Sequence, residues 1–238
     1  MPVSPAPEPP RPWLRLVLAI SLDGRLAPAG GGAAQIGGRG DRRALEEALA
    51  WADAALIGAG TLRAHGCTAL IHQPDLLAAR QACGRPPQPL ALAVARPDSL
   101  EAGLPFFQQP LRRWLLQAGP GAQGCGWLPP PAGYEAHGCF GRWPAALAAL
   151  AGAGLKRLAV LGGAQLAAAL LAEDLFDELQ LSLCPQLLGG GHLWLPAAAA
   201  LPGRTGAGAG ASWSLLEQRD LGGGEILLRY RRPPEAPC

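Results

Sequence analysis

Residues 156–195 constrain the fold of this chain more than any other stretch, because two strands, a helix and two glycine-rich turns follow one another without a break. Residues 157–161 form a short apolar run that ends at Gly162-Gly163, which is typical of a buried parallel strand. Residues 165–172 are rich in Ala and Leu and predict a helix. Residues 178–184 predict a second strand, which Pro185 and three consecutive glycines terminate.

A second corner of the same kind lies earlier in the chain. Residues 54–57 predict a strand, and Gly58-Ala59-Gly60-Thr61 leads into a helix that Thr61 is expected to cap. One glycine pair is explained better by packing than by a ligand. Two such corners meet at the carboxyl edge of a parallel sheet, where ligands of open α/β sheets bind. Together they favour a phosphate site, because helix N-termini present free N–H groups there.

The remaining segments predict one domain. Residues 13–24 form a strand ending in a polar turn, Asp41 is expected to cap the next helix, and residues 118–142 are expected to be irregular. Further predictions are a long loop at 67–89 with a helical stretch at 76–82, strands at 89–95 and 111–117, a helix at 143–154, a low-complexity loop at 196–211, and a hairpin of 212–220 with 225–232. Residues 1–12 and 233–238 are expected to be tails, the first proline-rich and disordered, and residues 13–232 a single domain.

Charge and cysteine content exclude several classes of protein. The net charge is +2 without any basic or acidic block, which gives no basis for binding nucleic acid or a membrane surface. The six cysteines are scattered without a CxxC motif, so reduced thiols are expected and no metal site is predicted. No run has the composition of a signal peptide or a membrane span, and a cytoplasmic location is therefore expected.

Three segments resemble the reductase domain of the bifunctional deaminase/reductase of riboflavin biosynthesis: SLDGRLA at 21–27, DAALIGAGTLRA at 53–64, and residues 160–191. The resemblance covers most of residues 13–195. It implies a dihydrofolate reductase-like α/β fold, with a single mixed, mostly parallel sheet flanked by helices and antiparallel C-terminal strands. It also implies NADPH-dependent reduction of 5-amino-6-(5-phosphoribosylamino)uracil, in which hydride reaches C1 of the ribosyl chain and yields the ribityl product.

The same resemblance implies a set of site residues. The nicotinamide is expected against Ala19, the cofactor phosphates near Thr61, and the pyrophosphate at the backbone of residues 163–166. Arg96 ends a strand where its guanidinium would pair with the 2′-phosphate of NADPH, and a solvated surface arginine explains it equally well. The residues expected to bind the cofactor are Ala19, Thr61, Leu62, Arg63, His65, Arg96, Gly162, Gly163, Ala164, Gln165 and Leu166. Those expected to bind the substrate are Ser21, Asp23, Gln35 and Leu161.

Four positions depart from the family pattern. His65 replaces an acidic residue, Leu49 an arginine for substrate phosphate, Leu161 a substrate-binding glutamate, and Gln35 a tryptophan. Leucine binds neither a phosphate nor a uracil N–H group. The cofactor half of the site is therefore expected to be kept, and the substrate half to be altered.

Few side chains are available to compensate for these changes. Arg42, Arg80 and Arg85 are candidates to replace the missing arginine. His65 is a candidate proton donor because imidazole titrates near neutral pH. Asp23 is expected either to act near the reacting centre or to hold its turn through an Asx-type bond.

Two rival functions remain open on the sequence. One is an NADPH reductase of the same fold that acts on another heterocycle, such as a pterin; the other is a noncatalytic nucleotide-binding homologue. The expected partners are a small-molecule substrate, a second copy of the chain in a homodimer, and a separate deaminase that supplies the substrate. No nucleic acid and no membrane partner is expected.

Overall fold

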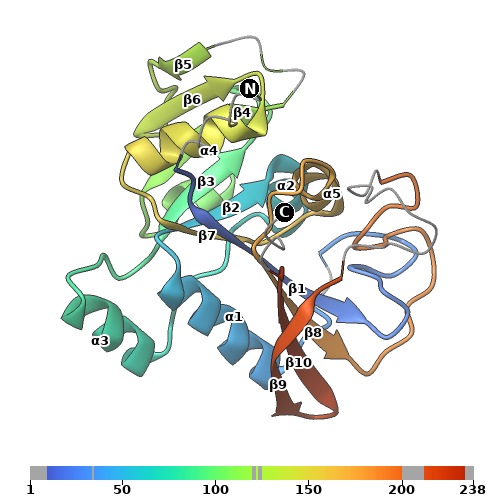
Figure 1. The fold of residues 1–238 in the computed structure, drawn as a ribbon. Coiled ribbons are helices and arrows are strands. Elements are labelled where there is room, and N and C mark those ends of the chain that lie inside the picture. The colour runs from blue at the N-terminus through green and yellow to red at the C-terminus, as the bar shows by residue number, and fades with distance from the viewer. Residues whose placement is uncertain (1–9, 34, 120–121, 123–124, 200–211, 234–238) are drawn as a thin grey trace, which may run out of the picture.

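The computed structural model describes residues 10–33, 35–119, 122, 125–199 and 212–233, and in this part of the chain ten strands form one sheet (Figure 1). The strand order across the sheet is β5-β6-β4-β3-β2-β7-β1-β8-β10-β9. No helix in the described ranges is long and apolar enough to cross a membrane.

The elements of the first half include one of the two glycine corners, where a helix directly follows a strand. They are β1 (Trp13–Ser21), α1 (Arg39–Trp51), β2 (Ala54–Gly58), α2 (Ala59–His65), α3 (Pro74–Ala82), β3 (Leu90–Val94), the 3-10 helix η1 (Pro105–Gln108) and β4 (Arg113–Ala118). Those of the second half are β5 (Cys125–Leu128), β6 (Ala136–Phe140), α4 (Trp143–Gly152), β7 (Arg157–Val160), α5 (Ala164–Ala172), β8 (Glu178–Cys184), β9 (Ser214–Gly222) and β10 (Glu225–Arg231).

The sheet is mixed and mostly parallel, as predicted. Strands β4, β3, β2, β7, β1 and β8 pair in parallel, as does β6 with β4, and the C-terminal strands β10 and β9 pair antiparallel. The prediction of an irregular segment at 118–142 is wrong, because it contains β5 and β6. Trp114, Trp127 and Phe140 stack edge to face across these strands, and this packing holds short strands that the local sequence does not specify.

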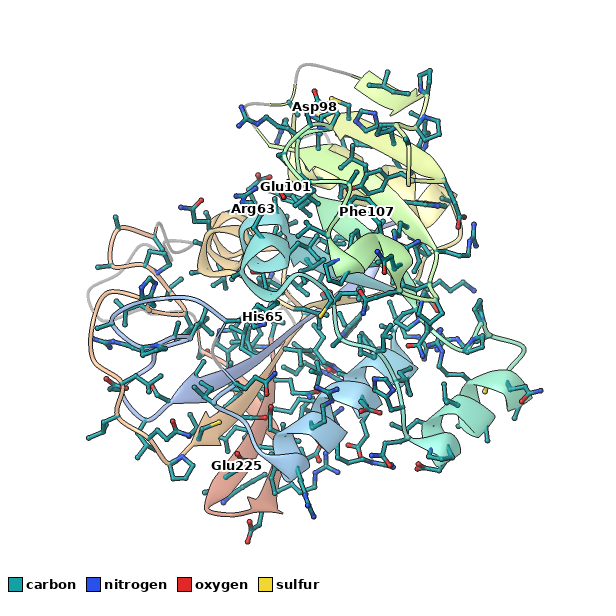
Figure 2. All side chains as sticks on the ribbon, turned by 180° about the vertical axis from the view of Figure 1, so that it is seen from behind. Arg63, His65, Asp98, Glu101, Phe107 and Glu225 are labelled. Carbon is teal, nitrogen blue, oxygen red and sulfur yellow. The ribbon has the colours of Figure 1, made fainter. Side chains whose placement is uncertain are left out.

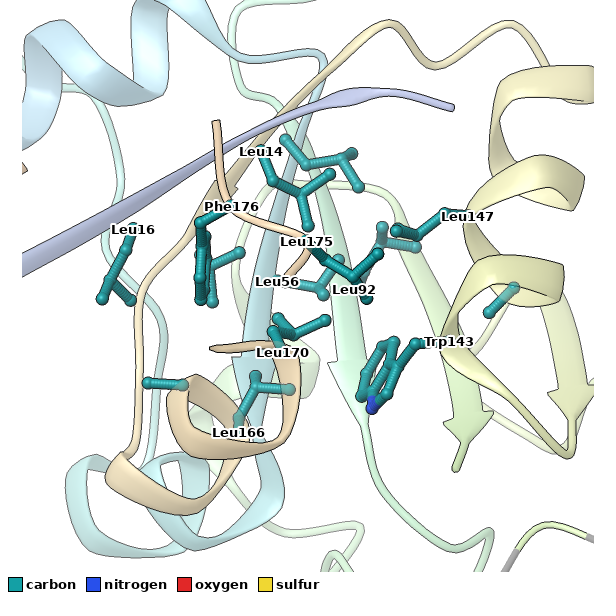
Figure 3. Packing of buried hydrophobic residues seen from close by; sticks show 14 of the residues in the cluster. Leu14, Leu16, Leu56, Leu92, Trp143, Leu147, Leu166, Leu170, Leu175 and Phe176 are labelled. Atoms are coloured by element: carbon teal, nitrogen blue, oxygen red, sulfur yellow. The ribbon is translucent and has the colours of Figure 1, made fainter. Parts of the chain in front are cut away.

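The two faces of β1 pack against different helices. Leu14 and Leu16 belong to the main core, which α4 and α5 cover with side chains such as Leu147 and Leu170 (Figure 3). Val17 points to the opposite face, where α1 covers it with residues such as Ala48 and Ala52. This alternation is the period of two that a strand buried on both faces requires.

Helix α1 has its N-terminus at the carboxyl edge of the sheet. Its last residue, Trp51, stacks on the Arg15 guanidinium at the start of β1, at 3.9 Å. Its first turn meets the β9–β10 hairpin so closely that a Cβ on Gly40 would lie 2.0 Å from the Leu221 carbonyl oxygen. The start of the hairpin's β10 pairs with the carboxyl end of β8. The N-terminus of α1 therefore lies at the same edge of the sheet as the two glycine corners.

Both predicted N-caps are wrong. Helix α1 begins after Gly38 and α2 begins after Gly58, so Asp41 and Thr61 lie inside the first turn of their helices. Neither N-cap residue forms a side-chain cap bond. At α1 the Glu225 carboxylate from β10 accepts the backbone N–H groups of Gly38 and Asp41 instead. A carboxylate at a helix N-terminus provides the same stabilisation that a capping side chain would.

The segment just before β1 is also anchored to the rest of the domain, through Arg11. Of the predicted N-terminal tail, residues 1–9 lie outside the described residues, while Arg11 donates to both carboxylate oxygens of Asp177 at 2.8 Å. At the other end, residues 234–238 and the predicted loop residues 200–211 also lie outside the described ranges.

Candidate functional site

The two glycine corners touch each other. The backbone N–H of Gly58 donates to the carbonyl oxygen of Gly162 at 3.1 Å. A Cβ on Gly163 would lie 2.9 Å from Oγ1 of Thr61, so there is no room for a side chain at that position. Neither N-cap glycine supplies a side-chain bond, and the first N–H groups of α2 and α5 thus remain available at one place. The peptide bond between Gly162 and Gly163 is cis.

Only some of the residues predicted to bind the cofactor can contact it through their side chains. Leu62 and Leu166 are buried and belong to core clusters, so their backbones alone can face a ligand. Ala164 is half-buried, and Gln165 is exposed in the first turn of α5. The structure thus brings Thr61, Gly162 and the start of α5 together, as expected from the sequence, with backbone groups as the main contribution.

The sheet opens beside Ala19. Strand β7 pairs with β1 only as far as the Leu16–Val160 pair, whereas β8 pairs with β1 up to Ser21. Beyond Leu16, β1 has no strand partner on the β7 side among the described residues, and the chain turns into the glycine pair instead. A Cβ on Gly162 would lie 3.0 Å from Cδ2 of Leu18. Half-buried Ala19 therefore lies at a break between strands at the carboxyl edge, where open sheets bind ligands.

Ser21 and Asp23 hold a loop together. The Ser21 hydroxyl is fully buried, donates to Asp23 and accepts the backbone N–H of Arg25 at 2.8 Å. Asp23 also accepts the N–H groups of Leu188 and Gly189, which fixes residues 21–25 against the loop after β8. The bond from Ser21, with these backbone bonds, lowers the pKa of Asp23 to about 2. An acid of this kind stays ionised at neutral pH, so the turn-holding alternative accounts for Asp23 fully.

Two arginines of the predicted cofactor set lie in α2 and in the turn after β3. Arg63 is exposed and donates to the carbonyl of Ser99 at 3.1 Å, and Ser99 in turn bonds to the carbonyl of Arg96 in the turn after β3. Within the described residues no carboxylate pairs with Arg96 or Arg63 at salt-bridge distance. His65 ends α2 and is exposed; Figure 2 shows Arg63 and His65 on this helix and Glu225 on the distant β10.

The substrate half of the site is apolar where the family pattern is charged. Leu49 is fully buried and packs with Ile71 and Leu161 in one cluster between α1 and β2. Leu161 contacts α1 on this face, which leaves no polar group at either position. Gln35 is exposed in the loop before α1.

None of the three candidate arginines replaces the missing one. Arg80 is buried and donates to the carbonyl groups of Leu49, Ala50 and Ala52 at the C-terminus of α1. Arg85 bonds to Ala50, Trp51 and Asp53 at the same end. Because these carbonyl groups have no partner inside the helix, the guanidinium groups act as its C-terminal cap.

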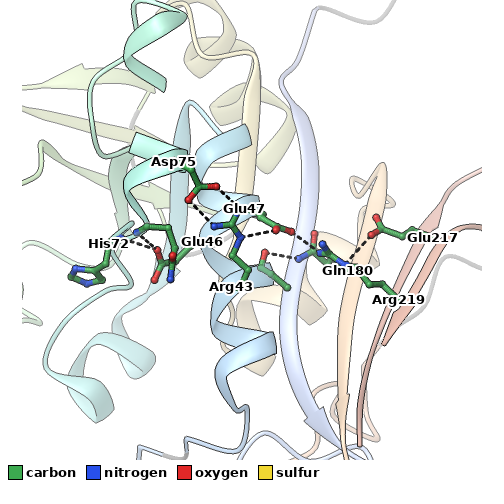
Figure 4. A network of polar contacts seen from close by, with 10 residues as sticks. Arg43, Glu46, Glu47, His72, Asp75, Gln180, Glu217 and Arg219 are labelled. Carbon is green, nitrogen blue, oxygen red and sulfur yellow. Dashed lines mark hydrogen bonds and ion pairs between the residues drawn. The ribbon is translucent and has the colours of Figure 1, made fainter. Parts of the chain in front are cut away.

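Arg42 is part of a surface network on α1. It pairs with Glu46 at 3.3 Å, and Glu46 accepts the N–H groups of His72 and Gln73 (Figure 4). The next residue, Arg43, donates to the carboxylates of both Glu47 and Asp75. This network attaches the loop before α3 to α1, and it keeps Arg42 away from the buried Leu49.

A cluster of polar residues at the start of α1 was missed by sequence reasoning. Asp41 accepts a hydrogen bond from the buried Ser182 hydroxyl of β8. Burial, together with the neighbouring Glu225 carboxylate, raises the pKa of Asp41. Burial and the same two carboxylates raise the pKa of the Cys184 thiol to about 12. These residues come from α1, β8 and β10, so no local sequence pattern contains them all. The one sequence signal for this cluster is that Asp41 follows closely on three glycines.

No metal site accompanies these residues. In the part of the chain that the structure describes, no three His, Cys, Asp or Glu side chains lie close enough together to hold a metal ion.

Comparison with known proteins identifies the family to which this chain belongs. Residues 12–95 and 140–200, more than half of the chain, match the family described as the RibD C-terminal domain. No curated protein matches the sequence. A pyrimidine reductase-like protein from Corynebacterium diphtheriae is similar in structure, with a TM-score of 0.69 and 19% identity over 94% of this chain and 93% of that one.

Two further solved structures share the fold. The deaminase/5-amino-6-(5-phosphoribosylamino)uracil reductase of Thermotoga maritima gives a TM-score of 0.69 and 16% identity, and the match covers 94% of this chain but only 57% of that one. The riboflavin biosynthesis reductase of Saccharomyces cerevisiae gives a TM-score of 0.59 and 14% identity, with 94% and 90% covered. The predicted dihydrofolate reductase-like fold of this reductase family is thereby confirmed.

Proposed function

Because this chain belongs to the RibD C-terminal domain family, we propose that it is a reductase of riboflavin biosynthesis. Its reaction is the NADPH-dependent reduction of 5-amino-6-(5-phosphoribosylamino)uracil to the ribityl product. The observation that carries the proposal is the contact between the two glycine corners, Gly58 with Gly162 and Gly163 with Thr61, beside the break in the sheet at Ala19.

The residues at this edge fit a dinucleotide cofactor. A Cβ on Gly163 would lie 2.9 Å from Thr61 Oγ1, so glycine at this position lets the two corners approach closely, as the backbone of a diphosphate site requires. The first N–H groups of α5 would hold the phosphates. When bound, NADPH supplies the hydride. Ala19 would provide a flat contact for the nicotinamide ring, and the apolar cluster of Leu49 and Leu161 would exclude water from one side.

Arg63 and Arg96 support the choice of NADPH over NADH. Arg63 donates to the Ser99 carbonyl in the turn after β3, Arg96 belongs to the same turn, and neither pairs with a carboxylate among the described residues. A 2′-phosphate would accept charge-assisted hydrogen bonds from either group. Removal of both charges is expected to reduce the affinity for NADPH more than that for NADH.

A second candidate function is favoured by one observation. Leu49 is fully buried against Leu161 and Ile71, so the positions that carry an arginine and a glutamate in the family pattern form an apolar contact instead. This contact favours a substrate without a phosphate group at that place, such as another heterocycle of the pterin type. The noncatalytic alternative would require that the chain bind NADPH without oxidising it.

Titration with NADPH and NADH, followed by addition of the pyrimidine, tests the proposal. Wild-type protein is expected to bind NADPH, and absorbance at the reduced-nicotinamide band is expected to fall when the pyrimidine is added. Gly163→Ala should weaken NADPH binding, because its Cβ would lie 2.9 Å from Thr61 Oγ1. Gly152→Ala is the matched control, since no atom lies within 4 Å of its added Cβ.

The outcomes separate the candidates. Oxidation of NADPH by the pyrimidine supports the riboflavin reaction, whereas oxidation only by a pterin supports the second candidate. Binding without any oxidation supports the noncatalytic homologue. Equal NADPH affinity of Gly163→Ala, Gly152→Ala and wild type would refute the cofactor site at the glycine corners.

The proposal extends to the assembly of the enzyme. A homodimer is supported by the outer strand β9, which has no second strand partner in the described residues and exposes Leu215 and Leu216. A separate, cytoplasmic deaminase would supply the substrate. Sedimentation equilibrium tests the dimer, and a monomer at micromolar concentration would refute it.

A further inference from the structure

We propose that Asp41 is the proton donor of the reduction, and that Glu225 is the positioning residue that keeps Asp41 protonated. This inference rests on the proposed function, because it assigns the proton that accompanies the hydride. It replaces His65, which lies exposed at the end of α2.

The sheet register places Asp41 next to the floor of the proposed nicotinamide site. Asp41 bonds to the hydroxyl of Ser182, and Ser182 is the direct partner of Ala19 on the neighbouring strand. Neighbouring strands lie about 4.8 Å apart, so the Ala19 methyl group and the Ser182 hydroxyl are adjacent on the α1 face of the sheet. Asp41 is also partly exposed, and can therefore exchange protons with solvent.

The two acids have opposite environments. The Glu225 carboxylate accepts two backbone N–H groups at the N-terminus of α1. Asp41 belongs to the same turn, but in the described part of the chain no backbone N–H group donates to its carboxyl group, which bonds to the Ser182 hydroxyl. Adjacent carboxylates repel each other, so the proton goes to the acid that accepts fewer N–H groups, which is Asp41. Such a division marks one acid of a pair as a proton donor.

The other groups that face Asp41 do not change this assignment. Cys184 from β8 is fully buried, and burial together with the two acids keeps its thiol protonated. Arg42, on α1 itself, favours the charged form of Asp41, but it is more than half exposed and paired with Glu46. The backbone of Gly37 covers the carboxyl group, since a Cβ there would lie 2.0 Å from Oδ2.

The chemical step balances with Asp41 as the acid. C1 of the ribosyl group accepts the hydride and is reduced, while NADPH is oxidised to NADP⁺. The bond between C1 and the ring oxygen breaks, and its electron pair stays on that oxygen. The oxygen takes the proton from the Asp41 carboxyl group and becomes the hydroxyl of the ribityl chain. Water then returns a proton to the Asp41 carboxylate.

The pH profile of kcat tests the assignment. In wild type the rate should fall as pH rises through a pKa above the usual aspartate range, because the donor must be protonated. Asp41→Asn should lower kcat about 100-fold or more, with little change in the KM for NADPH, and should abolish this limb of the profile. Glu225→Gln should move the limb to lower pH. Asp75→Asn is the matched control: Asp75 also lies in the first turn of a helix but pairs with Arg43 at the surface.

A second measurement does not depend on turnover. The carbon-13 NMR shift of the Asp41 carboxyl group should titrate above the usual aspartate range in wild type and move toward that range in Glu225→Gln. An ordinary titration of Asp41, or an unchanged pH profile in Asp41→Asn, would overturn the inference while NADPH oxidation by wild type still upheld the proposed function. Loss of NADPH oxidation in wild type would overturn both.

Discussion

Replacement of Arg80 by methionine should destabilise the protein strongly, although Arg80 lies far from the proposed site. Its side chain is 3% exposed, and its Nη1 donates to the carbonyl groups of Leu49, Ala50 and Ala52. Its Nε donates to the carbonyl of Pro86 at 2.7 Å. Methionine keeps the aliphatic stem but removes both donors, so each of these four carbonyl groups loses a charged donor. The carbonyl groups of Leu49 and Ala50 keep one partner each, the N–H of Ala52 and the guanidinium of Arg85.

The magnitude follows from two buried, charge-assisted donors. A hydrogen bond to a charged group contributes about 1.5–3 kcal/mol. Burial opposes this gain, because it lowers the pKa of Arg80 to about 10. We therefore expect Arg80→Met to reduce the free energy of unfolding by about 3 kcal/mol, which corresponds to about 6–12 °C in Tm for a domain of this size.

Urea and thermal unfolding followed by circular dichroism measure this loss. Arg112→Met is the matched control, because the Arg112 side chain is 59% exposed and pairs with that of Glu135, which is 46% exposed. Surface pairs contribute about 0–1 kcal/mol, so the control should stay near wild type. Equal unfolding midpoints for Arg80→Met and Arg112→Met would refute the capping role of Arg80.

Three further predictions concern the acids and the apolar cluster. The pKa of Asp23 is lowered to about 2, so its stabilising effect is present above pH about 4 and lost as the pH falls toward 2; Asp23→Asn should flatten this acid limb in a plot of Tm against pH. The pKa of Asp41 is raised, so its ionisation costs stability as pH rises; Asp41→Asn should melt at a higher temperature than wild type at pH 8 and equally at pH 3, and a lower Tm at pH 8 would contradict the carboxylate pair. Leu49 is fully buried, so Leu49→Arg should lower the unfolding free energy by more than about 4 kcal/mol, and soluble protein with wild-type midpoints in urea would show that the cluster opens readily.

Local sequence patterns were sufficient to predict the central strand β7 and the helix α5. An apolar run, a glycine pair and an Ala/Leu segment determine β7 and α5, because each is specified by neighbouring residues. The β9–β10 hairpin follows in the same way from Gly222, Gly223 and Gly224, which all have positive φ angles that glycine adopts without strain. The prediction that both glycine corners share one edge needed only the rule that parallel strands end on the same side.

Contacts between segments that are far apart in the sequence determine the helix caps and the partners of the charged residues. The sequence predicted that Gly163 and Thr61 belong to one site, and in the structure the two residues touch. The tertiary structure assigned Arg80 and Arg85 to the end of α1 rather than to a substrate. The caps of α1 and the Asp41–Glu225 pair depend on a hairpin about 180 residues away in the chain. A residue's local sequence sets its conformational preference, whereas its charge state and partners depend on which remote groups are buried with it.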